Sequence, residues 1–329
     1  MFGRLELLLY VLLAGSLVQA TGVPALGENP VVDGYFGDPT VLIHEGTLYL
    51  MATKDPWGGD DLACFSTTDL KSWRSHTLNW PTYDACISES KNGNRVWAPE
   101  VIRGPDGRFY LYVSVGSEIY CGVAAHPLGP WENVRKDRGP IVHSQRGSAV
   151  HTIDASPFID TDGRVYLYWG SGHNWENGQC MAVELEPDMH TFRGAAKNIT
   201  PPNYFEGPHM VKRNGKYYLM YSEGKTIDKS YQVRYAVGDS PLGSFTKEGR
   251  NSPILSTDEQ LSVWGPGHHC VFSIHGQDFI AYHRHRRPYD PDPMRRQICF
   301  DFLSFDRDGW IERVRPTESG IAPLAGPLE

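Results

Sequence analysis

The chain has 329 residues, including 34 glycines and 24 prolines, and 12% of its residues are aromatic. This composition excludes a disordered or coiled-coil chain and favours a β-rich globular protein with many turns. The net charge of −8 argues against nucleic acid binding, since Asp290 and Asp292 dilute the one concentrated basic stretch, Arg286–Arg296.

The first twenty residues have the pattern of a secretory signal peptide. Arg4 precedes an apolar run from Leu7 to Leu17, and Val18-Gln19-Ala20 ends in a small residue that suits cleavage. A membrane anchor is the alternative, but the run is short for a bilayer core of about 30 Å. No later segment is apolar enough to span a membrane. We therefore expect residues 1–20 to be removed and the mature protein to be secreted, extracellular and free of the membrane.

Five later segments share one plan: a polar head, an apolar strand, a glycine turn and an aromatic-rich strand. In chain order they cover residues 37–53, 98–115, 154–170, 206–224 and 267–283, and their turn glycines stand 52 to 61 residues apart. An Asp, Asn, His or Glu before glycine, between alternating apolar runs, predicts a hairpin. An outer strand pair follows, so each repeat holds about four strands, as propeller blades do. The sequence predicts an all-β, single-domain, five-bladed β-propeller over residues 28–322.

The polar heads of these hairpins are chemically distinctive. They are Asp38, the segment Trp97–Glu100, Asp154, Glu206 and His268. The first strand of each propeller blade lines the central channel, so we expect the heads to meet at one mouth. Gathering carboxylates costs free energy, which indicates function rather than structure. Two carboxyl groups beside a glycosidic bond suffice for hydrolysis, and a third one near the acid raises its pKa.

Six cysteines are present: Cys64, Cys86, Cys121, Cys180, Cys270 and Cys299. In a secreted chain they allow 15 complete pairings, among which the sequence does not choose. Several lie in apolar, strand-like runs, where a buried free thiol is the alternative. None has the CxxC spacing typical of a zinc site, so no zinc is expected.

The chain resembles glycoside hydrolase family 43, five-bladed propellers that act on arabinan and xylan side chains. The resemblance covers nearly the whole mature chain and rests on five motifs, one per blade: NPVVDGYFGDPTV (29–41), VWAPEV (96–101), IDASPFIDTDGRVYLYWG (153–170), FEGPH (205–209) and GPGHHCVF (265–272). It implies that Asp38 is the general base, Glu206 the general acid, and Asp154 the carboxylate that tunes and orients the acid. The family often has alanine and proline where this chain has Gly37 and Ala155, a departure that does not touch the carboxylates.

The same resemblance implies further site residues. His268 matches a histidine on the channel axis that in many members faces a calcium or other ion through water, and His269 is the alternative inward-facing ring. One ring supplies few metal ligands, so a satisfied core histidine is the other interpretation. Arg296 matches an arginine that reaches the acid and the substrate, with Arg295 as the alternative, and Trp97 matches a subsite wall. No cofactor is expected to be required, and a calcium ion on the axis is left open.

We therefore expect a secreted, inverting glycoside hydrolase that cleaves α-L-arabinofuranosyl linkages in plant cell-wall polysaccharide such as arabinan or arabinoxylan. Inversion implies about 6.5–9.5 Å between the acid and base carboxyl groups. A β-D-xylosidase acting on xylo-oligosaccharides is one alternative, since the same carboxylates serve both sugars. A non-catalytic carbohydrate-binding propeller is the other. Blade connections decide between exo and endo action, and residues 54–62, which include Trp57, are expected to form an exposed one.

Overall fold

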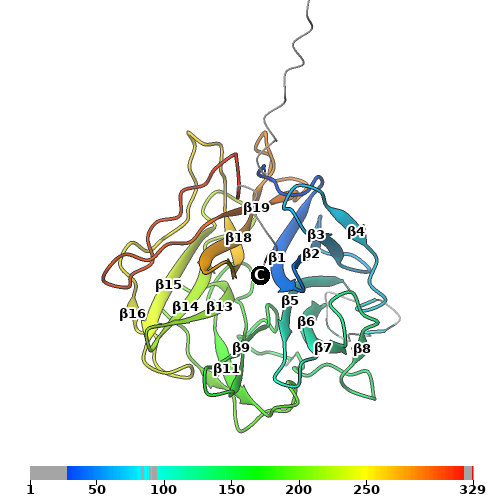
Figure 1. The fold of residues 1–329 in the computed structure, drawn as a ribbon. Helices are drawn as coiled ribbons and strands as arrows, with labels where there is room; N and C mark the ends of the chain where they lie inside the picture. The colour runs from blue at the N-terminus through cyan, green and yellow to red at the C-terminus, as the bar shows by residue number, and fades with distance from the viewer. Residues whose placement is uncertain are drawn as a thin grey trace, which may run out of the picture.

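The computed structural model describes residues 28–82, 85–86, 88, 90, 95–144, 146–321 and 328, and throughout these residues the regular elements are β-strands. They form five antiparallel sheets around a central axis (Figure 1). No helix in the described part of the chain has the length and apolar character needed to cross a membrane. The predicted signal peptide and the predicted domain end at residue 322 lie outside the described residues.

Each sheet is one blade, and its strands follow one another in chain order from the axis outward. Blade one contains β1 (Phe36–His44), β2 (Thr47–Lys54), β3 (Ala63–Thr67) and β4 (Arg74–His76). Blade two contains β5 (Val96–Arg103), β6 (Phe109–Val115), β7 (Glu118–Ala124) and β8 (Glu132–Asn133). Blade three contains β9 (Ser156–Ile159), β10 (Val165–Trp169), β11 (Met181–Leu185) and β12 (Lys197–Asn198). Blade four contains β13 (Glu206–Arg213), β14 (Lys216–Glu223), β15 (Gln232–Gly238) and β16 (Lys247–Glu248). Blade five contains β17 (Gly267–Ile274), β18 (Gln277–His285) and β19 (Arg296–Phe302).

The first strands form a closed ring. Strand β1 packs against β5 and β17, β9 against β5 and β13, and β13 against β17. The five predicted hairpins are the inner strand pairs of the five blades, each turning at an Xaa-Gly pair. The prediction of an all-β, five-bladed propeller is therefore confirmed.

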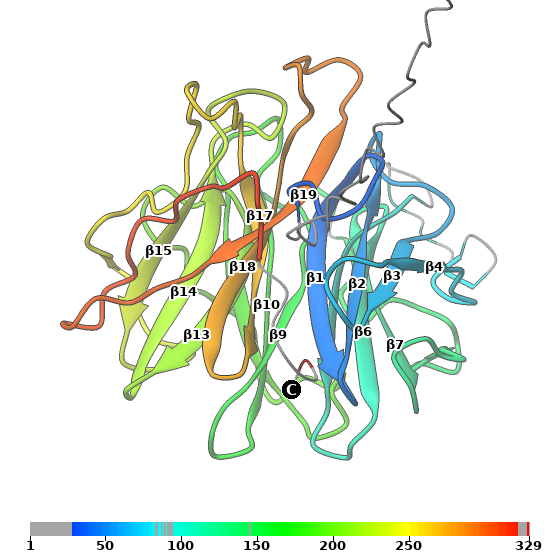
Figure 2. The same ribbon diagram turned by 45° about the horizontal axis from the view of Figure 1, so that its top comes forward.

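Blade five differs from the predicted four-strand plan, because its sheet has three strands in the described chain. The outer edge of β19 is covered instead by the N-terminal segment, the dark blue start of the described chain (Figure 2). The amide of Val31 donates to the carbonyl of Ile298 (2.9 Å), and Asn29 exchanges hydrogen bonds with the backbone of Phe300 (2.8 and 3.0 Å). An exposed strand edge invites pairing with other chains, so this segment both protects the edge and joins the two ends of the ring.

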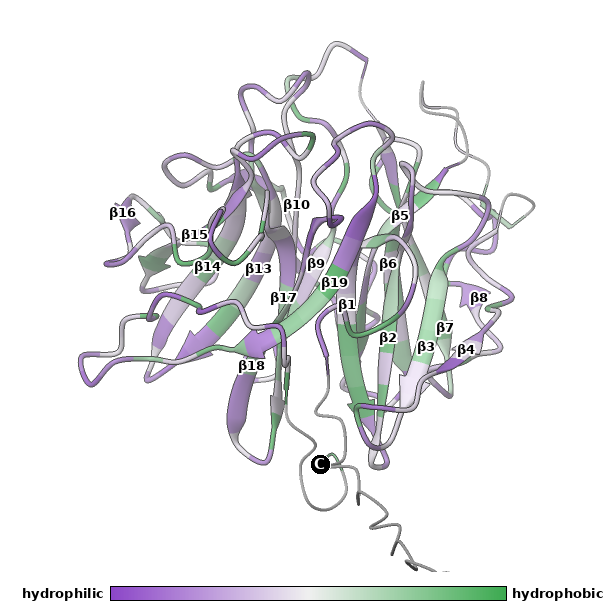
Figure 3. Cartoon of the chain, turned by 90° about the horizontal axis from the view of Figure 1, so that it is seen from above, coloured by the Kyte–Doolittle hydropathy of each residue, from purple (hydrophilic) through white to green (hydrophobic). Residues whose placement is uncertain are grey.

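The core consists of five hydrophobic clusters, each at the interface between two neighbouring blades. A middle strand is therefore covered on both faces and carries an uninterrupted apolar run, as in Val165–Trp169. Hydrophobic residues follow the strands and polar residues the connections (Figure 3). Most tyrosines of the repeated motifs are buried here. All six cysteines are buried and free, so the structure shows the thiol alternative rather than disulfides.

Candidate active site

Each blade approaches the axis through one residue in the left-handed backbone conformation. The φ angles are 51° at Asp38, 46° at Ala98, 61° at Asp154, 59° at Gly207 and 41° at His268. Non-glycine residues rarely adopt positive φ. In four of the blades the pairing with the second strand also shifts register here, which marks a β-bulge. Bulges near active sites turn side chains in new directions, and here they aim the polar heads toward the axis.

The three carboxylates do not occupy equivalent positions in their blades. Asp38 and Asp154 take the left-handed position itself, whereas Glu206 stands one residue before it, because Gly207 takes that position in blade four. Within the shared hairpin plan, Glu206 is therefore offset by one residue from Asp38 and Asp154. Glu206 matches the position of Trp97 in blade two.

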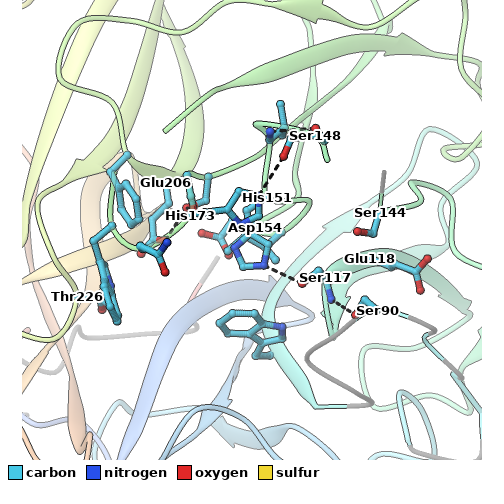
Figure 4. A pocket seen from close by; sticks show the side chains of 18 of the residues that line it. Ser90, Ser117, Glu118, Ser144, Ser148, His151, Asp154, His173, Glu206 and Thr226 are labelled. Atoms are coloured by element: carbon cyan, nitrogen blue, oxygen red, sulfur yellow. Dashed lines mark hydrogen bonds between the residues drawn. The ribbon is translucent and has the colours of Figure 1, made fainter. Parts of the chain in front are cut away.

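A cavity of about 1050 Å³ opens at this end of the axis (Figure 4). All the side chains predicted for the site line it: Asp38, Trp97, Asp154, Glu206, His268 and Arg296. The structure thus brings together residues from all five blades. Trp57 also lines the cavity and is half-buried, so the prediction of an exposed connection misses its place in the site.

Asp38, 4% exposed, is surrounded by groups that favour its charged form. Thr53 donates its hydroxyl to Oδ2 (2.8 Å), and Arg296 donates from Nη1 to Oδ1 (2.6 Å). Nδ1 of His268 lies 3.3 Å from the same Oδ1. Burial by itself would raise the pKa of Asp38, but Arg296, His268 and His283 together hold that pKa well below its ordinary value. Asp38 is therefore a carboxylate at neutral pH and can accept a proton.

Arg296 connects Asp38 to a second acid, Asp55, which the sequence did not single out. Its guanidinium is 4% exposed and donates from Nη2 to Oδ1 of Asp55 (2.7 Å). Gly37 makes room for it, since a Cβ there would lie 2.0 Å from Cζ of Arg296. This explains physically why this chain has glycine rather than alanine before Asp38. The alternative arginine, Arg295, lies over the ring of Tyr35 instead.

This arrangement differs from the expected one, in which Arg296 reaches the acid and the substrate. Its hydrogen bonds go to Asp38 and Asp55, not to Glu206. The difference has an electrostatic consequence, because a fixed cation lowers the pKa of the carboxylate that it contacts.

Glu206 is almost as buried as Asp38, at 9% exposed, but its partners are neutral. Tyr231 donates its hydroxyl to Oε1 (2.7 Å) and Ser171 donates to Oε2 (3.1 Å). Burial raises the pKa of Glu206 to about 7, against the lowering effect of the Tyr231 hydrogen bond and with a further rise from the charge of Asp38. A proton is therefore available on this group near neutral pH.

Asp154 lies between the other two acids. Its Oδ2 accepts a hydrogen bond from the amide of Gly207 (3.2 Å) and lies 3.6 Å from Nδ1 of His268. Burial, then the charges of Glu206 and Asp38, raise the pKa of Asp154 well above its ordinary value. The role of Asp154 as the carboxylate that tunes and orients the acid stays a prediction, and these pKa shifts indicate that the two carboxyl groups compete for ionisation.

His268, rather than His269, is the axial histidine that faces the cavity. His269 is buried away from the site, with its ring 5.9 Å from that of His209. Calcium prefers six to eight oxygen ligands. In the described residues no three His, Cys, Asp or Glu side chains are placed to hold a metal ion, and Nδ1 of His268 faces two carboxylates. The calcium expectation at His268 is therefore not supported.

Several residues around the carboxylates escaped sequence reasoning. His283 accepts a hydrogen bond at Nδ1 from the amide of Asp38 (3.2 Å), and its ring stacks on Tyr231 at 5.5 Å. Burial, then Arg296, lowers the pKa of His283 to about 3, so the ring is neutral. These groups stand on second strands or connections, where no motif marks them.

Comparison with known proteins agrees with this geometry. Residues 27–311 match the family model described as Glycosyl hydrolases family 43. The chain is 35% identical to the beta-D-galactofuranosidase xynD of Aspergillus niger, covering 93% of this chain and 90% of that protein. It is 28% identical to an arabinoxylan arabinofuranohydrolase of Paenibacillus polymyxa, covering 91% of this chain and 53% of that longer protein.

A solved structure of a thermostable family-43 glycoside hydrolase is also similar. It superposes with a TM-score of 0.72 at 28% identity, covering 92% of this chain and 99% of that one. The chain therefore belongs to family 43 of the glycosyl hydrolases, and it is a glycoside hydrolase built on a five-bladed propeller.

Proposed function

We propose that this chain is an inverting furanosidase in which Asp38 is the general base and Glu206 the general acid. One observation carries the proposal: the pKa values of two carboxyl groups in one cavity are shifted in opposite directions. Asp38 stays charged, whereas Glu206 can keep its proton near neutral pH. Pairs of titratable groups with separated pKa values identify acid and base roles.

In the proposed reaction, Asp38 takes a proton from a water molecule that attacks the anomeric carbon. Glu206 gives its proton to the departing glycosidic oxygen, so the C–O bond breaks as the new one forms on the opposite face. Asp154 competes with Glu206 for ionisation, and its contact with the Gly207 amide ties it to the backbone next to the acid. His268 and Arg296 keep Asp38 charged between turnovers.

For the substrate, we propose an α-L-arabinofuranosyl linkage in a plant cell-wall polysaccharide such as arabinoxylan or arabinan. Both reported relatives carry furanosidase names, which favours a furanoside over the xylopyranoside alternative. A second candidate is the β-D-galactofuranosyl linkage, which the 35% identity to the A. niger protein favours. The two sugars share their ring configuration, and galactofuranose carries one extra hydroxymethyl carbon.

A panel of three aryl glycosides tests the proposal: α-L-arabinofuranoside, β-D-galactofuranoside and β-D-xyloside. We expect the largest kcat/KM on the arabinofuranoside. Proton NMR spectra should show that the sugar first released has the opposite anomeric configuration to the substrate. Preference for the galactofuranoside would select the second candidate. Preference for the xyloside would overturn the furanosidase proposal, and a retained anomer would overturn the assignment of Asp38 as base.

We also propose that the protein is exported after cleavage near Ala20, on the pattern of its first twenty residues. N-terminal sequencing of the protein recovered from culture medium tests this. A mature chain that still begins at Met1 would contradict it.

A further inference from the structure

The cavity extends well beyond the three carboxylates. Much of its remaining wall comes from blades two and three: Ser117, Glu118, residues 143–144 and 146–148, and residues 171–175. Pockets of about 300–1,000 Å³ already hold drug-sized ligands, so a cavity of about 1050 Å³ has room for more than one sugar ring. The carboxylates lie at its axial end. We call the remaining part of the cavity, which has no assigned role, the arm.

A row of rings leads from the catalytic end into the arm. The ring centres of Trp97 and His151 are 6.2 Å apart, and those of His151 and His173 are 5.2 Å apart. The hydroxyl of Ser117 forms a hydrogen bond with Nε2 of His151 (2.8 Å), and Nε2 of His173 donates to the carbonyl of Ser148 (3.3 Å) (Figure 4). Burial, then His173, lowers the pKa of His151 to about 4, so its ring is neutral. The row offers flat ring faces to the C–H faces of sugars.

The connection between β10 and β11 is held in a strained conformation that presents Trp175 to the arm. Asn174 and Trp175 have φ angles of 54° and 59°, and Trp175 is half-buried at the cavity wall. A Cβ at Gly172 would lie 1.8 Å from the carbonyl oxygen of Glu176, so the turn is closed too tightly for any other residue. Left-handed non-glycine residues are strained, and such strain clusters at active sites and ligand clamps.

Glu118 supplies a polar anchor on the blade-two wall of the arm. It is 7% exposed, and its Oε2 accepts the hydroxyl of Ser88 at 2.6 Å. The exposed His143 lies beside it, with Nδ1 3.5 Å from Oε1. In the part of the chain that the structure describes, no lysine or arginine pairs with it. A buried carboxylate at a cavity wall without a cation is costly unless a ligand's hydroxyl groups satisfy it.

We propose that Trp175 and Glu118 form a second sugar subsite, which binds the neutral sugar unit that leaves when the furanosyl bond is cut. Ser171 indicates on which side of the scissile bond this subsite lies. Its hydroxyl donates to Glu206, and it begins the connection that carries Trp175. Because Glu206 protonates the leaving oxygen under the proposed function, this connection lies on the leaving-group side. The inference rests on that function and adds that the enzyme selects a carbohydrate leaving group.

The test compares two substrates with the same furanosyl unit, one with an aryl leaving group and one with a xylo-oligosaccharide leaving group. Trp175→Ala and Glu118→Gln should each lower kcat/KM on the oligosaccharide by about tenfold or more, while aryl hydrolysis stays within about twofold. Trp175→Phe, which keeps an aromatic face, should retain most of the oligosaccharide rate and guards against misfolding. Glu132→Gln, an exposed position on β8 of the same blade, is the matched control.

Unchanged oligosaccharide hydrolysis in both variants would overturn the subsite. An equal loss on both substrates would also overturn it, because the residues would then act at the furanosyl unit. Failure of the proposed function has a different signature, since the wild-type enzyme itself would then not hydrolyse the aryl furanoside.

Discussion

Each of two walls of the catalytic cavity buries one acid to nearly the same extent, but the two walls shift the pKa of their acids in opposite directions. On the wall made by blades one and five, Asp38 is 4% exposed and its pKa is held well below the ordinary value. On the wall made by blades three and four, Glu206 is 9% exposed and its pKa is raised to about 7. Burial alone would raise both pKa values, so the neighbours decide the outcome.

The difference between the walls is the charge of the hydrogen-bond donors. Asp38 receives a hydrogen bond from the guanidinium of Arg296, which Asp55 fixes on its other side. Among the described residues, the hydrogen bonds to Glu206 come from hydroxyl groups, those of Tyr231 and Ser171. Charge-assisted hydrogen bonds are roughly twice as strong as neutral ones, so only the first wall offsets the cost of burying a charge.

The largest effect should come from removing either acid. Asp38→Asn and Glu206→Gln should each lower kcat on the preferred aryl furanoside by about 10²–10⁴-fold, because general acid–base catalysis contributes that much. Initial rates and thermal unfolding curves check this. Asp137→Asn, at an exposed connection, is the control. Turnover near the wild-type level in either variant would refute its assigned role.

Breaking the charged wall should affect both stability and pH dependence. Arg296→Met leaves Asp38 and Asp55 buried without their cation, which should destabilise the fold by about 3–5 kcal/mol. The pKa of Asp38 should rise, so the acid limb of kcat/KM should move to higher pH. Urea unfolding and a pH–rate profile measure the two effects. Arg295→Met is the matched control, and an unmoved acid limb would contradict the role given to Arg296.

On the neutral wall, Asp154→Asn tests whether Asp154 is charged while Glu206 keeps its proton. The pKa of Asp154 lies well above its ordinary value, and the raised pKa of Glu206 comes from burial and the charge of Asp38. An amide is neutral, as a protonated Asp154 is, so the alkaline limb of kcat/KM, expected near pH 7, should stay close to its wild-type position. A clear move of that limb to lower pH would show that Asp154 is charged in the wild type and raises the pKa of Glu206.

A small upward shift should come from Tyr231→Phe. Its hydroxyl stabilises the charged form of Glu206, so its loss should raise the pKa of that group and move the alkaline limb upward by about one pH unit or less. Tyr204→Phe removes a similar buried hydroxyl that donates to the carbonyl of Gly170 instead, and its alkaline limb should not move. Equal shifts in the two variants would assign the effect to packing rather than to the hydrogen bond.

The blades and the three acids could be predicted because both rest on short-range patterns. A few neighbouring residues determine a hairpin, as Asn214-Gly215 does between two apolar runs. Once the hairpin is located, the polar residue at the start of its first strand is located as well. The one-residue offset of Glu206 was missed because Gly207 in EGPH takes the left-handed position that Asp38 and Asp154 take themselves. Tyr231 and Ser171 were missed because they follow second strands, outside any repeated head.

The sequence by itself determined the five-bladed architecture, the family and which three carboxylates meet at the axis. Only the tertiary structure decided which of them keeps a charge. That depends on contacts between residues far apart in the chain, such as the bond from Arg296 to Asp38 across 258 positions. Electrostatic interactions depend on distance and surroundings in space, whereas the pattern of a strand or turn depends on adjacent residues.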